Sequence, residues 1–429
     1  MTQVELRDDG ANLAELARAR ASGARARTGE ALESQLAYLR ETRADHGYSP
    51  AAQKLFDLVL SYIDDAEDAH RSGRARAAWM SGGVWSPLFY ACDTIPISIN
   101  EVGRLGSADA MAVAEDYFQL PKESCSMVGA VLGEFYLRLE RTVKRMAVFN
   151  VQCEPLNVAW ELLKNEGFDI FRVEGVNRPN AADGDARVAA LEAFLEDEIR
   201  DLAVWLQGQP VDETRLAEEI RRNNRMVAKV RRILHLRVDN PLYLRSLAAM
   251  YLLIGTGHSF GKPDAFEAVV DELLEELERP GNVRPYPKNL VRLVWSGGRG
   301  QEFGVYKTID DNGGAVTAWH TPDDWTRDYR EDLDPIKSYA DYILTGRALG
   351  SPIRRLERID ETLSPFKAQG ILFYGYVGCS FGGIHREIAA SYFQKKGVPS
   401  ISLEGSFQVG PPSGQLLTRI RAFIEMLQR

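Results

Sequence analysis

The chain has 429 residues, of which 45% are hydrophobic and 26% charged, and its formal net charge at pH 7 is −9. This composition is typical of a folded globular protein and excludes a disordered, collagen-like or coiled-coil chain. The acidic balance argues against nucleic acid as a partner, because phosphate-binding surfaces normally need an excess of Lys and Arg. A chain of this length is expected to form two or three domains.

The first ten residues, MTQVELRDDG, lack the charged and then apolar pattern of a signal peptide. No apolar run along the chain is long enough to cross a membrane. We therefore expect a cytoplasmic protein that has no membrane partner. In that reducing compartment cysteines are thiols or metal ligands rather than structural disulfides.

Residues 1–75 are predicted to form a helical N-terminal segment. Their apolar residues recur at helical spacing, as in Leu55, Leu58, Val59 and Tyr62. Between residues 76 and 180, short apolar stretches at 146–151 and 169–173 alternate with a helical stretch at 156–163. This alternation is typical of βαβ units and predicts a first α/β domain with a parallel sheet.

Residues 181–285 return to a helical period and are predicted to be a helical insertion. Its basic stretch, 221–237, is interpreted as a solvated or subunit-facing helix face rather than an anion site. Residues 286–429 are predicted to be a second α/β domain, with strands at 291–295, 315–319, 370–374 and 400–403. A closing helix from about residue 413 carries an apolar stripe that should dock on this sheet. The predicted fold is therefore two doubly wound, Rossmann- or flavodoxin-like parallel-sheet domains.

The sequence contains no complete match to the common catalytic motifs considered next. The stretch GTGHSFGKP at 255–263 resembles a phosphate-binding loop, but the glycine spacing is wrong and Pro263 replaces the Ser or Thr that would hold magnesium. The stretch WSGGRGQEFG at 295–304 is interpreted as a tight strand-to-helix turn, with a phosphate contact as the alternative. The six histidines show no zinc-hydrolase spacing, and no Gly-x-Ser-x-Gly motif occurs. Any ATP hydrolysis is therefore expected on a partner.

Three of the four cysteines lie where an apolar strand meets a helix or loop. They are Cys125 in ESCSM, Cys153 in NVQCEP and Cys379 in YVGCSFGG. The fourth, Cys92 in YACD, is predicted to be a small core residue. The separations of 28 and 226 residues match no compact zinc or ferredoxin motif, and spacing alone favours unrelated buried thiols. The alternative is a set of thiolate ligands that meets at a domain interface, where ligand sites commonly form.

The flanks of these cysteines carry a resemblance to a known family. Cys125-Ser126 follows an opening unit, Cys153 follows an apolar strand, and Cys379 precedes a long helix. Beyond that helix come KGVP at 396–399, SLE at 402–404 and TRIRAF at 418–423. In this order and with these flanks, the chain resembles the subunits of 2-hydroxyacyl-CoA dehydratases and the B and C subunits of ATP-dependent benzoyl-CoA reductase. The resemblance runs from about residue 80 to the carboxyl end.

The resemblance implies a [4Fe–4S] cluster bound by Cys125, Cys153 and Cys379, with one iron left for a non-protein ligand. It also implies partners: a homologous second cluster-bearing subunit, ATP-hydrolysing iron–sulfur activator subunits that carry the only ATP, and a CoA thioester substrate. Single electrons would pass from the activator to the thioester. The segment ending at Asp93 looks closer to the reductase B subunit, so ring reduction of benzoyl-CoA type is preferred over (R)-2-hydroxyacyl-CoA dehydration.

Two alternatives to this cluster-bearing enzyme subunit remain at this point. In the first, the chain is an electron-transfer subunit with no substrate site of its own; in the second, it is a cluster-free α/β binding protein with three inert thiols. The residues do not identify an acid–base group, and Glu154 and His385 are both candidates. The choice of CoA ester, the fourth iron ligand and the subunit stoichiometry also stay open.

Overall fold

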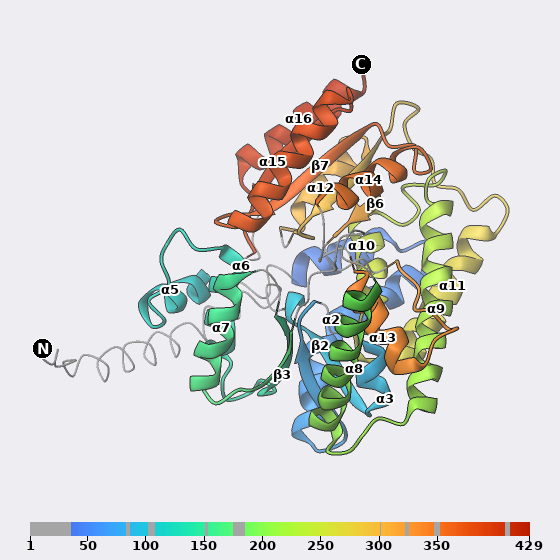
Figure 1. Cartoon of the computed structure of the whole chain (residues 1–429). Helices are drawn as coiled ribbons and strands as arrows, with labels where there is room; N and C mark the ends of the chain where they lie inside the picture. The colour runs from blue at the N-terminus through green and yellow to red at the C-terminus, as the bar shows by residue number, and fades with distance from the viewer. Residues whose placement is uncertain are drawn as a thin grey trace, which may run out of the picture.

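The computed structural model describes residues 36–82, 86–101, 108–150, 153–174, 185–300, 302–321, 326–346, 352–407 and 412–429. Their strands form two parallel sheets of four strands each, and helices cover the sheets (Figure 1). The predicted α/β class with two doubly wound sheets is confirmed. Residues 1–35 of the predicted N-terminal helical segment lie outside the described part of the chain. Residues 36–45 and α2 (Pro50–Arg71) are helical.

The first sheet has the strand order β2-β1-β3-β4. Its strands are β1 (Arg76–Met80), β2 (Thr94–Ser98), β3 (Arg145–Asn150) and β4 (Asp169–Glu174). The last two agree with the predicted strands at 146–151 and 169–173. The connections contain α3 (Ser86–Ala91), the 3-10 helix η1 (Ile99–Glu101), α5 (Ala108–Asp116), α6 (Ser126–Leu137) and α7 (Glu154–Asn165).

The second sheet repeats this order as β6-β5-β7-β8. Its strands are β5 (Val291–Gly297), β6 (Gly314–His320), β7 (Gly370–Tyr376) and β8 (Ser400–Gly405), in agreement with the four predicted strands. Its helices are α12 (Gly304–Asp311), α13 (Pro335–Leu344), α14 (Pro352–Leu363), α15 (Ser380–Lys395) and α16 (Gly414–Leu427). Ser413 caps α16 by accepting from the Leu416 amide, as the predicted start of the closing helix requires.

The helices of the predicted insertion pack against both sheets. They are α8 (Asp185–Gln207), α9 (Glu213–Leu236), α10 (Ser246–Gly255) and α11 (Pro263–Glu278). All ten residues of α10 are buried, and one apolar core contains residues of α10, of β1 and β3, and of β5. In a second core cluster, α13 packs on α8 beside β1 and β3. The two sheets therefore share their hydrophobic core, while the predicted division of the chain at residues 75, 180 and 285 stays a prediction.

The basic residues of α9 form ion pairs within the protein. Lys229 lies 2.5 Å from Asp271 of α11, Arg232 lies 3.1 Å from Glu278, and Arg222 contacts Asp264 at the start of α11. These pairs join α9 to α11 and neutralise Arg222, Lys229 and Arg232. Among the described residues, no helix is both long enough and apolar enough to cross a membrane.

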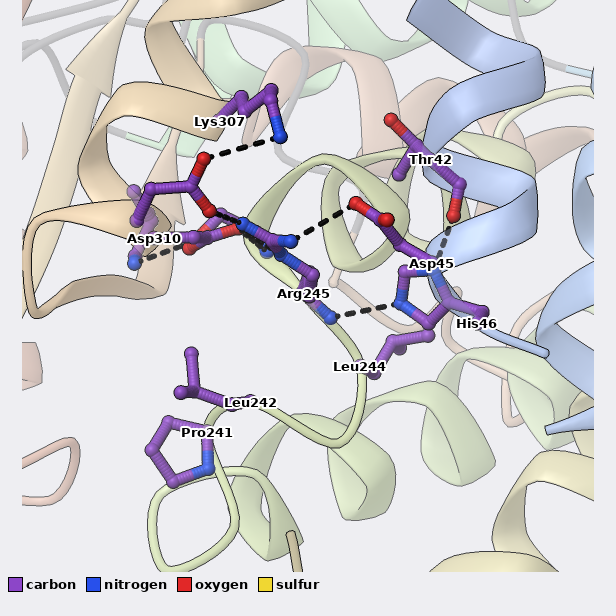
Figure 2. Close-up of polar contacts among 12 residues, drawn as sticks. Thr42, Asp45, His46, Pro241, Leu242, Leu244, Arg245, Lys307 and Asp310 are labelled. Atoms are coloured by element: carbon purple, nitrogen blue, oxygen red, sulfur yellow. Dashed lines mark hydrogen bonds and ion pairs between the residues drawn. The ribbon is translucent and has the colours of Figure 1, made fainter. Parts of the chain in front are cut away.

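A buried histidine joins the N-terminal helix to the start of α10. The Nδ1 of His46 lies 2.7 Å from the Thr42 carbonyl oxygen, and its Nε2 lies 3.2 Å from the backbone nitrogen of Arg245 (Figure 2). Because the Arg245 amide donates, Nε2 must accept, and the ring is neutral with its proton on Nδ1. The Arg245 guanidinium also contacts Asp45 and Asp310. Burial lowers the pKa of His46 to about 4.

This arrangement predicts a loss of stability in mild acid. Unfolded His46 takes up a proton near its ordinary pKa of 6.5, whereas the folded protein resists protonation down to about pH 4. Neutral His46 therefore contributes fully to the free energy of unfolding above pH 6.5. This contribution, about 3 kcal/mol at most, is lost as the pH falls from 6.5 towards 4. In urea unfolding between pH 7 and pH 4, the free energy of unfolding should fall more steeply with pH for the parent than for His46→Gln. The exposed His235→Gln should behave like the parent, and equal slopes for parent and His46→Gln would contradict the prediction.

Candidate functional site

Each of the three predicted ligand cysteines stands at the amino end of a helix. Cys125 precedes α6, Cys153 precedes α7, and Cys379 precedes α15. The Sγ of Cys379 accepts a hydrogen bond of 3.2 Å from the Gly382 amide. The amino end of a helix carries unsatisfied N–H groups and a partial positive charge, both of which favour thiolate over thiol. This effect is realised at Cys379, whose pKa is lowered, whereas burial and contact with Cys379 outweigh it at Cys125 and burial outweighs it at Cys153.

Cys153 and Cys379 occupy equivalent places in the two sheets. Each follows the third strand of a 2-1-3-4 order, after β3 in the first sheet and after β7 in the second. In open parallel sheets, ligands bind outside the carboxyl ends of the strands, where the strand order reverses. In both sheets that reversal lies between the first and third strands. The repeat of strand order thus places both cysteines at the positions where this fold commonly forms a site.

Close backbone contacts hold the loop at 377–379, between β7 and α15, against the start of α6. Figure 1 shows α15 and α6 on the same side of the molecule. The Ser126 amide donates to the Val377 carbonyl over 3.0 Å, and the Phe407 amide donates to the Ser126 hydroxyl over 3.1 Å. Gly378 has a φ of +77°, and a Cβ there would lie 2.5 Å from the Ser124 carbonyl oxygen. Only glycine permits this approach. The loop before Cys379 is therefore built to lie against Cys125.

The three thiols influence one another electrostatically. A hydrogen bond with Cys125 is the main reason why the pKa of Cys379 falls to about 6, with further help from the Gly382 amide and the Arg386 charge. The same hydrogen bond, followed by burial, raises the pKa of Cys125. Burial raises the pKa of Cys153, and the charge of Cys379 adds to this effect. The structure thus brings together all three cysteines that the sequence predicted.

All three cysteines line one cavity of about 320 Å³ between the facing edges of the sheets. Most of its wall is apolar, with contributions from both halves of the chain: Ile99, Met127, Val128, Phe149, Leu156, Leu356, Ile359, Phe373, Phe381 and Ile388. Pockets of about this size with a few placed polar groups are typical of small-molecule sites. The polar lining also includes basic and imidazole side chains: Arg299, His320, Arg355, His385 and Arg386.

A buried ion pair bridges the two halves at this cavity. Arg299, in the turn after β5, contacts the carboxylate of Glu101 and the carbonyl of Asn100 in η1. The Arg299 side chain is 4% exposed and that of Glu101 is fully buried. The preceding Gly297 has a φ of +115°, and a Cβ there would lie 2.1 Å from the Tyr374 carbonyl oxygen. The tight turn predicted at 295–304 therefore exists in its described residues and aims Arg299 across the interface.

The structure also locates the other residues that the sequence singled out. Cys92 is fully buried and burial raises its pKa to about 12, as expected for a core thiol. The near miss to a phosphate loop at 255–263 contains a 3-10 turn, η3 (Ser259–Gly261), which packs on α2 and α11. His385 lines the cavity, whereas Glu154 is not among the described residues that line it. Sequence reasoning identified the turn that holds Arg299 but not the role of its side chain, and it missed Arg355, which belongs to no motif.

The thiol groups at the cavity are of the donor type that iron–sulfur clusters use. Among the described residues, no group of three or more His, Cys, Asp or Glu side chains is gathered tightly enough to hold one metal ion. Three thiols around a shared cavity are nevertheless the ligand chemistry of iron–sulfur clusters, which are bound by Cys thiolates and are larger than one ion. With no fourth cysteine among the described residues lining the cavity, three thiolates would leave one ligand position to another group.

Two comparisons with known proteins both find dehydratase subunits. Residues 84–427 match the family model of the 2-hydroxyglutaryl-CoA dehydratase D-component. A protein named "Putative dehydratase subunit YjiM" from Escherichia coli (strain K12) is 25% identical over 229 residues. That alignment covers 51% of this chain and 59% of the relative, so the chain spans less than two thirds of it. Because the family match covers most of the sequence, this chain belongs to the 2-hydroxyglutaryl-CoA dehydratase D-component family.

Proposed function

We propose that this chain is the cluster-bearing subunit of an enzyme that acts on CoA thioesters, with Cys125, Cys153 and Cys379 as ligands of a [4Fe–4S] cluster. The observation that carries the proposal is that three cysteines, each at the amino end of a helix, line one cavity between two parallel sheets. When bound, the cluster would supply one-electron transfer and an iron with a position for a non-protein ligand.

The chain's own residues prepare this cavity for the chemistry. The Gly382 amide and the Arg386 guanidinium favour negative charge on the Cys379 sulfur. The apolar side chains of both halves exclude water, which strengthens electrostatic interactions inside the cavity. Arg386 is itself held by Glu404 at 2.5 Å, across the face of Gly375, where a Cβ would clash with it. These contacts restrict the Arg386 guanidinium to a position beside the Cys379 sulfur.

The reaction we propose first is dehydration of an (R)-2-hydroxyacyl-CoA. Both the family model and the E. coli relative carry the name of a dehydratase. The preference for ring reduction of benzoyl-CoA depended on the segment that ends at Asp93. Asp93 pairs with Arg215 at 2.6 Å on the protein surface, and it is not among the described residues that line the cavity. Its identity therefore carries no information about the substrate, and ring reduction becomes the second candidate.

The electrons would come from partners. Since the segment at 255–263 lacks the hydroxyl that holds magnesium in a phosphate loop, ATP hydrolysis is assigned to a separate iron–sulfur activator. A homologous cluster-bearing subunit would complete the enzyme. A subunit that only relays electrons is the remaining alternative, and the size and apolar lining of the cavity favour a substrate site instead.

Turnover of the complex with ATP and dithionite under anaerobic conditions tests the reaction. We expect (R)-2-hydroxyacyl-CoA esters to lose water and form the 2-enoyl-CoA, with benzoyl-CoA unchanged; mass spectrometry of the esters measures both. Reduction of benzoyl-CoA without any dehydration would reverse the order of the two candidates. A complex that contains the cluster but converts neither ester would support the electron-relay alternative.

A further inference from the structure

One histidine at the cavity forms no hydrogen bond within the protein. His385, in the second turn of α15, is partly buried and lines the cavity. Its ring packs edge-on against Phe381, one turn earlier on the same helix, with 4.6 Å between the ring centroids. Neither of its ring nitrogens is hydrogen-bonded to a residue that the structure describes. Both nitrogens of this imidazole are therefore available to a molecule bound in the cavity.

The other five histidines are differently placed. Four of them are not among the described residues that line the cavity: His46, His70, His235 and His258. The fifth, His320, lines the cavity at the end of β6, and its Nε2 lies 2.6 Å from the Thr362 hydroxyl oxygen. The Thr362 hydroxyl donates its hydrogen to the Arg358 carbonyl over 2.7 Å, so Nε2 of His320 must be the donor to Thr362. His320 is thus held in one orientation, with its Nε2 proton engaged by the protein.

The remaining titratable groups of the cavity wall do not suit proton transfer near pH 7. None of the described lining residues is an Asp or a Glu, and the three cysteines are the proposed cluster ligands. Phenol and guanidinium groups ordinarily titrate at pH 10 or above. The phenol of Tyr374 also donates its hydrogen to Glu302 over 2.6 Å. Imidazole is the side chain that gains and loses a proton between pH 5 and 8, which directs attention to His385.

The surroundings of His385 favour its neutral form. Burial, followed by the charge of Arg355 on α14, lowers the pKa of His385 below its ordinary value of 6.5. The next two residues of α15, Arg386 and Glu387, lie 3.6 Å apart as an ion pair, and Arg386 also pairs with Glu404 of β8. At pH 7 the ring therefore has one nitrogen that can accept a proton. Once protonated, it is a stronger acid than ordinary imidazolium and returns the proton readily.

His385 shares the cavity with the proposed cluster ligand of its own helix. Cys379 precedes α15 and His385 follows six residues later, so about 9 Å of helix axis separates the two positions. One turn beyond His385, Ala389 packs with Leu356 and Ile359 of α14 and closes this end with apolar side chains. An acyl group bound next to the cluster would extend along this face of α15, where His385 is the group that can exchange a proton.

We propose that His385 is the acid–base residue of the cavity, which takes a proton from carbon 3 of the acyl group and gives it to the hydroxide that leaves carbon 2. This inference rests on the proposed function for dehydration as the reaction. The C–H bond at carbon 3 and the C–O bond at carbon 2 break, a double bond forms between the two carbons, and the transferred proton converts hydroxide to water. The 2-enoyl ester and water together have the composition and oxidation level of the 2-hydroxyacyl ester, so no net electron is consumed.

Chemical rescue of a variant tests this role. His385→Ala removes the imidazole and leaves space for a small base. In the anaerobic complex with its activator, ATP and dithionite, we expect kcat for dehydration to fall about 100- to 10,000-fold, with KM nearly unchanged. The iron content should equal that of the parent. Added imidazole should restore part of the lost rate, in proportion to its unprotonated fraction. His320→Ala is the matched control in the same cavity and should not respond to imidazole, and the exposed His235→Ala should behave like the parent.

The pH dependence of kcat/KM gives a second measurement that needs no added base. A general base must be unprotonated, so the parent should lose activity as the pH falls below about 6.5. His385→Gln cannot be protonated, and its low activity should stay constant over the same range. An acidic limb that is the same in His385→Gln and in the parent would assign the titration to another group and overturn the inference.

Three further outcomes would also overturn it. His385→Ala with the activity of the parent would exclude His385 from proton transfer. A loss of activity accompanied by a loss of iron or a lower melting temperature, without rescue, would show that the residue is structural. Rescue of His320→Ala but not of His385→Ala would transfer the role to His320. Failure of the proposed function looks different, because the parent complex would then dehydrate no (R)-2-hydroxyacyl-CoA ester.

Discussion

Replacement of Cys125, Cys153 or Cys379 by Ser is expected to remove the cluster and abolish turnover, whereas the same change at Cys92 leaves both intact. A [4Fe–4S] cluster held by three thiolates loses a third of its protein ligands with each substitution, and a Ser hydroxyl stays protonated near neutral pH. The anaerobically purified parent should contain about four irons and as many sulfides per chain, and each of the three variants less than about one. Iron and sulfide analysis with EPR of the dithionite-reduced protein measures this.

Cys92→Ser is the matched control because it makes the same chemical change at a fully buried thiol outside the cavity. Its iron content should equal that of the parent. Normal iron in any one of the three ligand variants would remove that cysteine from the ligand set. Absence of iron from a folded parent would contradict the whole cluster proposal and leave a family fold with three thiols. Air exposure adds a further test, since an incompletely ligated cluster should bleach within hours.

The sequence was sufficient to predict the parts of the fold that depend on local pattern. Strands β3 to β8 are runs of apolar and β-branched residues bounded by turns, and all six were located within two or three residues. Cys125, Cys153 and Cys379 were identified by their flanks. The reason for their convergence became visible only in the structure: the same strand order in both sheets places β3 and β7, and hence two of the cysteines, at equivalent edges.

Contacts between distant segments could not be predicted from one sequence. Arg299 and Glu101 are 198 residues apart, and each looks like an ordinary charged residue in its own segment. Likewise α13 belongs to the connection between β6 and β7, yet it packs on α8 beside the first sheet. Arg355 lies in a basic, strongly amphipathic stretch that suggests a solvated helix face. Periodicity indicates that a helix is present but not what its individual side chains contact, so the basic lining of the cavity had no signal in the sequence.

Arg299→Met is expected to destabilise the protein by about 3–5 kcal/mol, the loss typical of breaking a buried ion pair. The substitution removes the Arg299 guanidinium from the fully buried carboxylate of Glu101 and from the Asn100 carbonyl. Because this pair joins η1 of the first half to the turn after β5, its loss should also loosen the edge that faces the cavity. Urea unfolding at pH 7 measures the change, and hydrogen exchange of the amides around Asn100 and Arg299 locates it.

Removing both charges should be much less harmful than removing one. In the double variant Arg299→Met/Glu101→Leu no unpaired charge is left in the interior, and buried ion pairs replaced by apolar residues of similar volume are often neutral or stabilising. We therefore expect the double variant to recover most of the stability lost in Arg299→Met, a coupling typical of residues that contact each other. Arg43→Met, which breaks an exposed pair with Asp57, should change stability by less than about 1 kcal/mol. Additive losses of stability in the double variant would contradict this prediction. They would mean that Arg299 stabilises the interface between the two halves through its backbone turn and its packing, and that its ion pair with Glu101 contributes little.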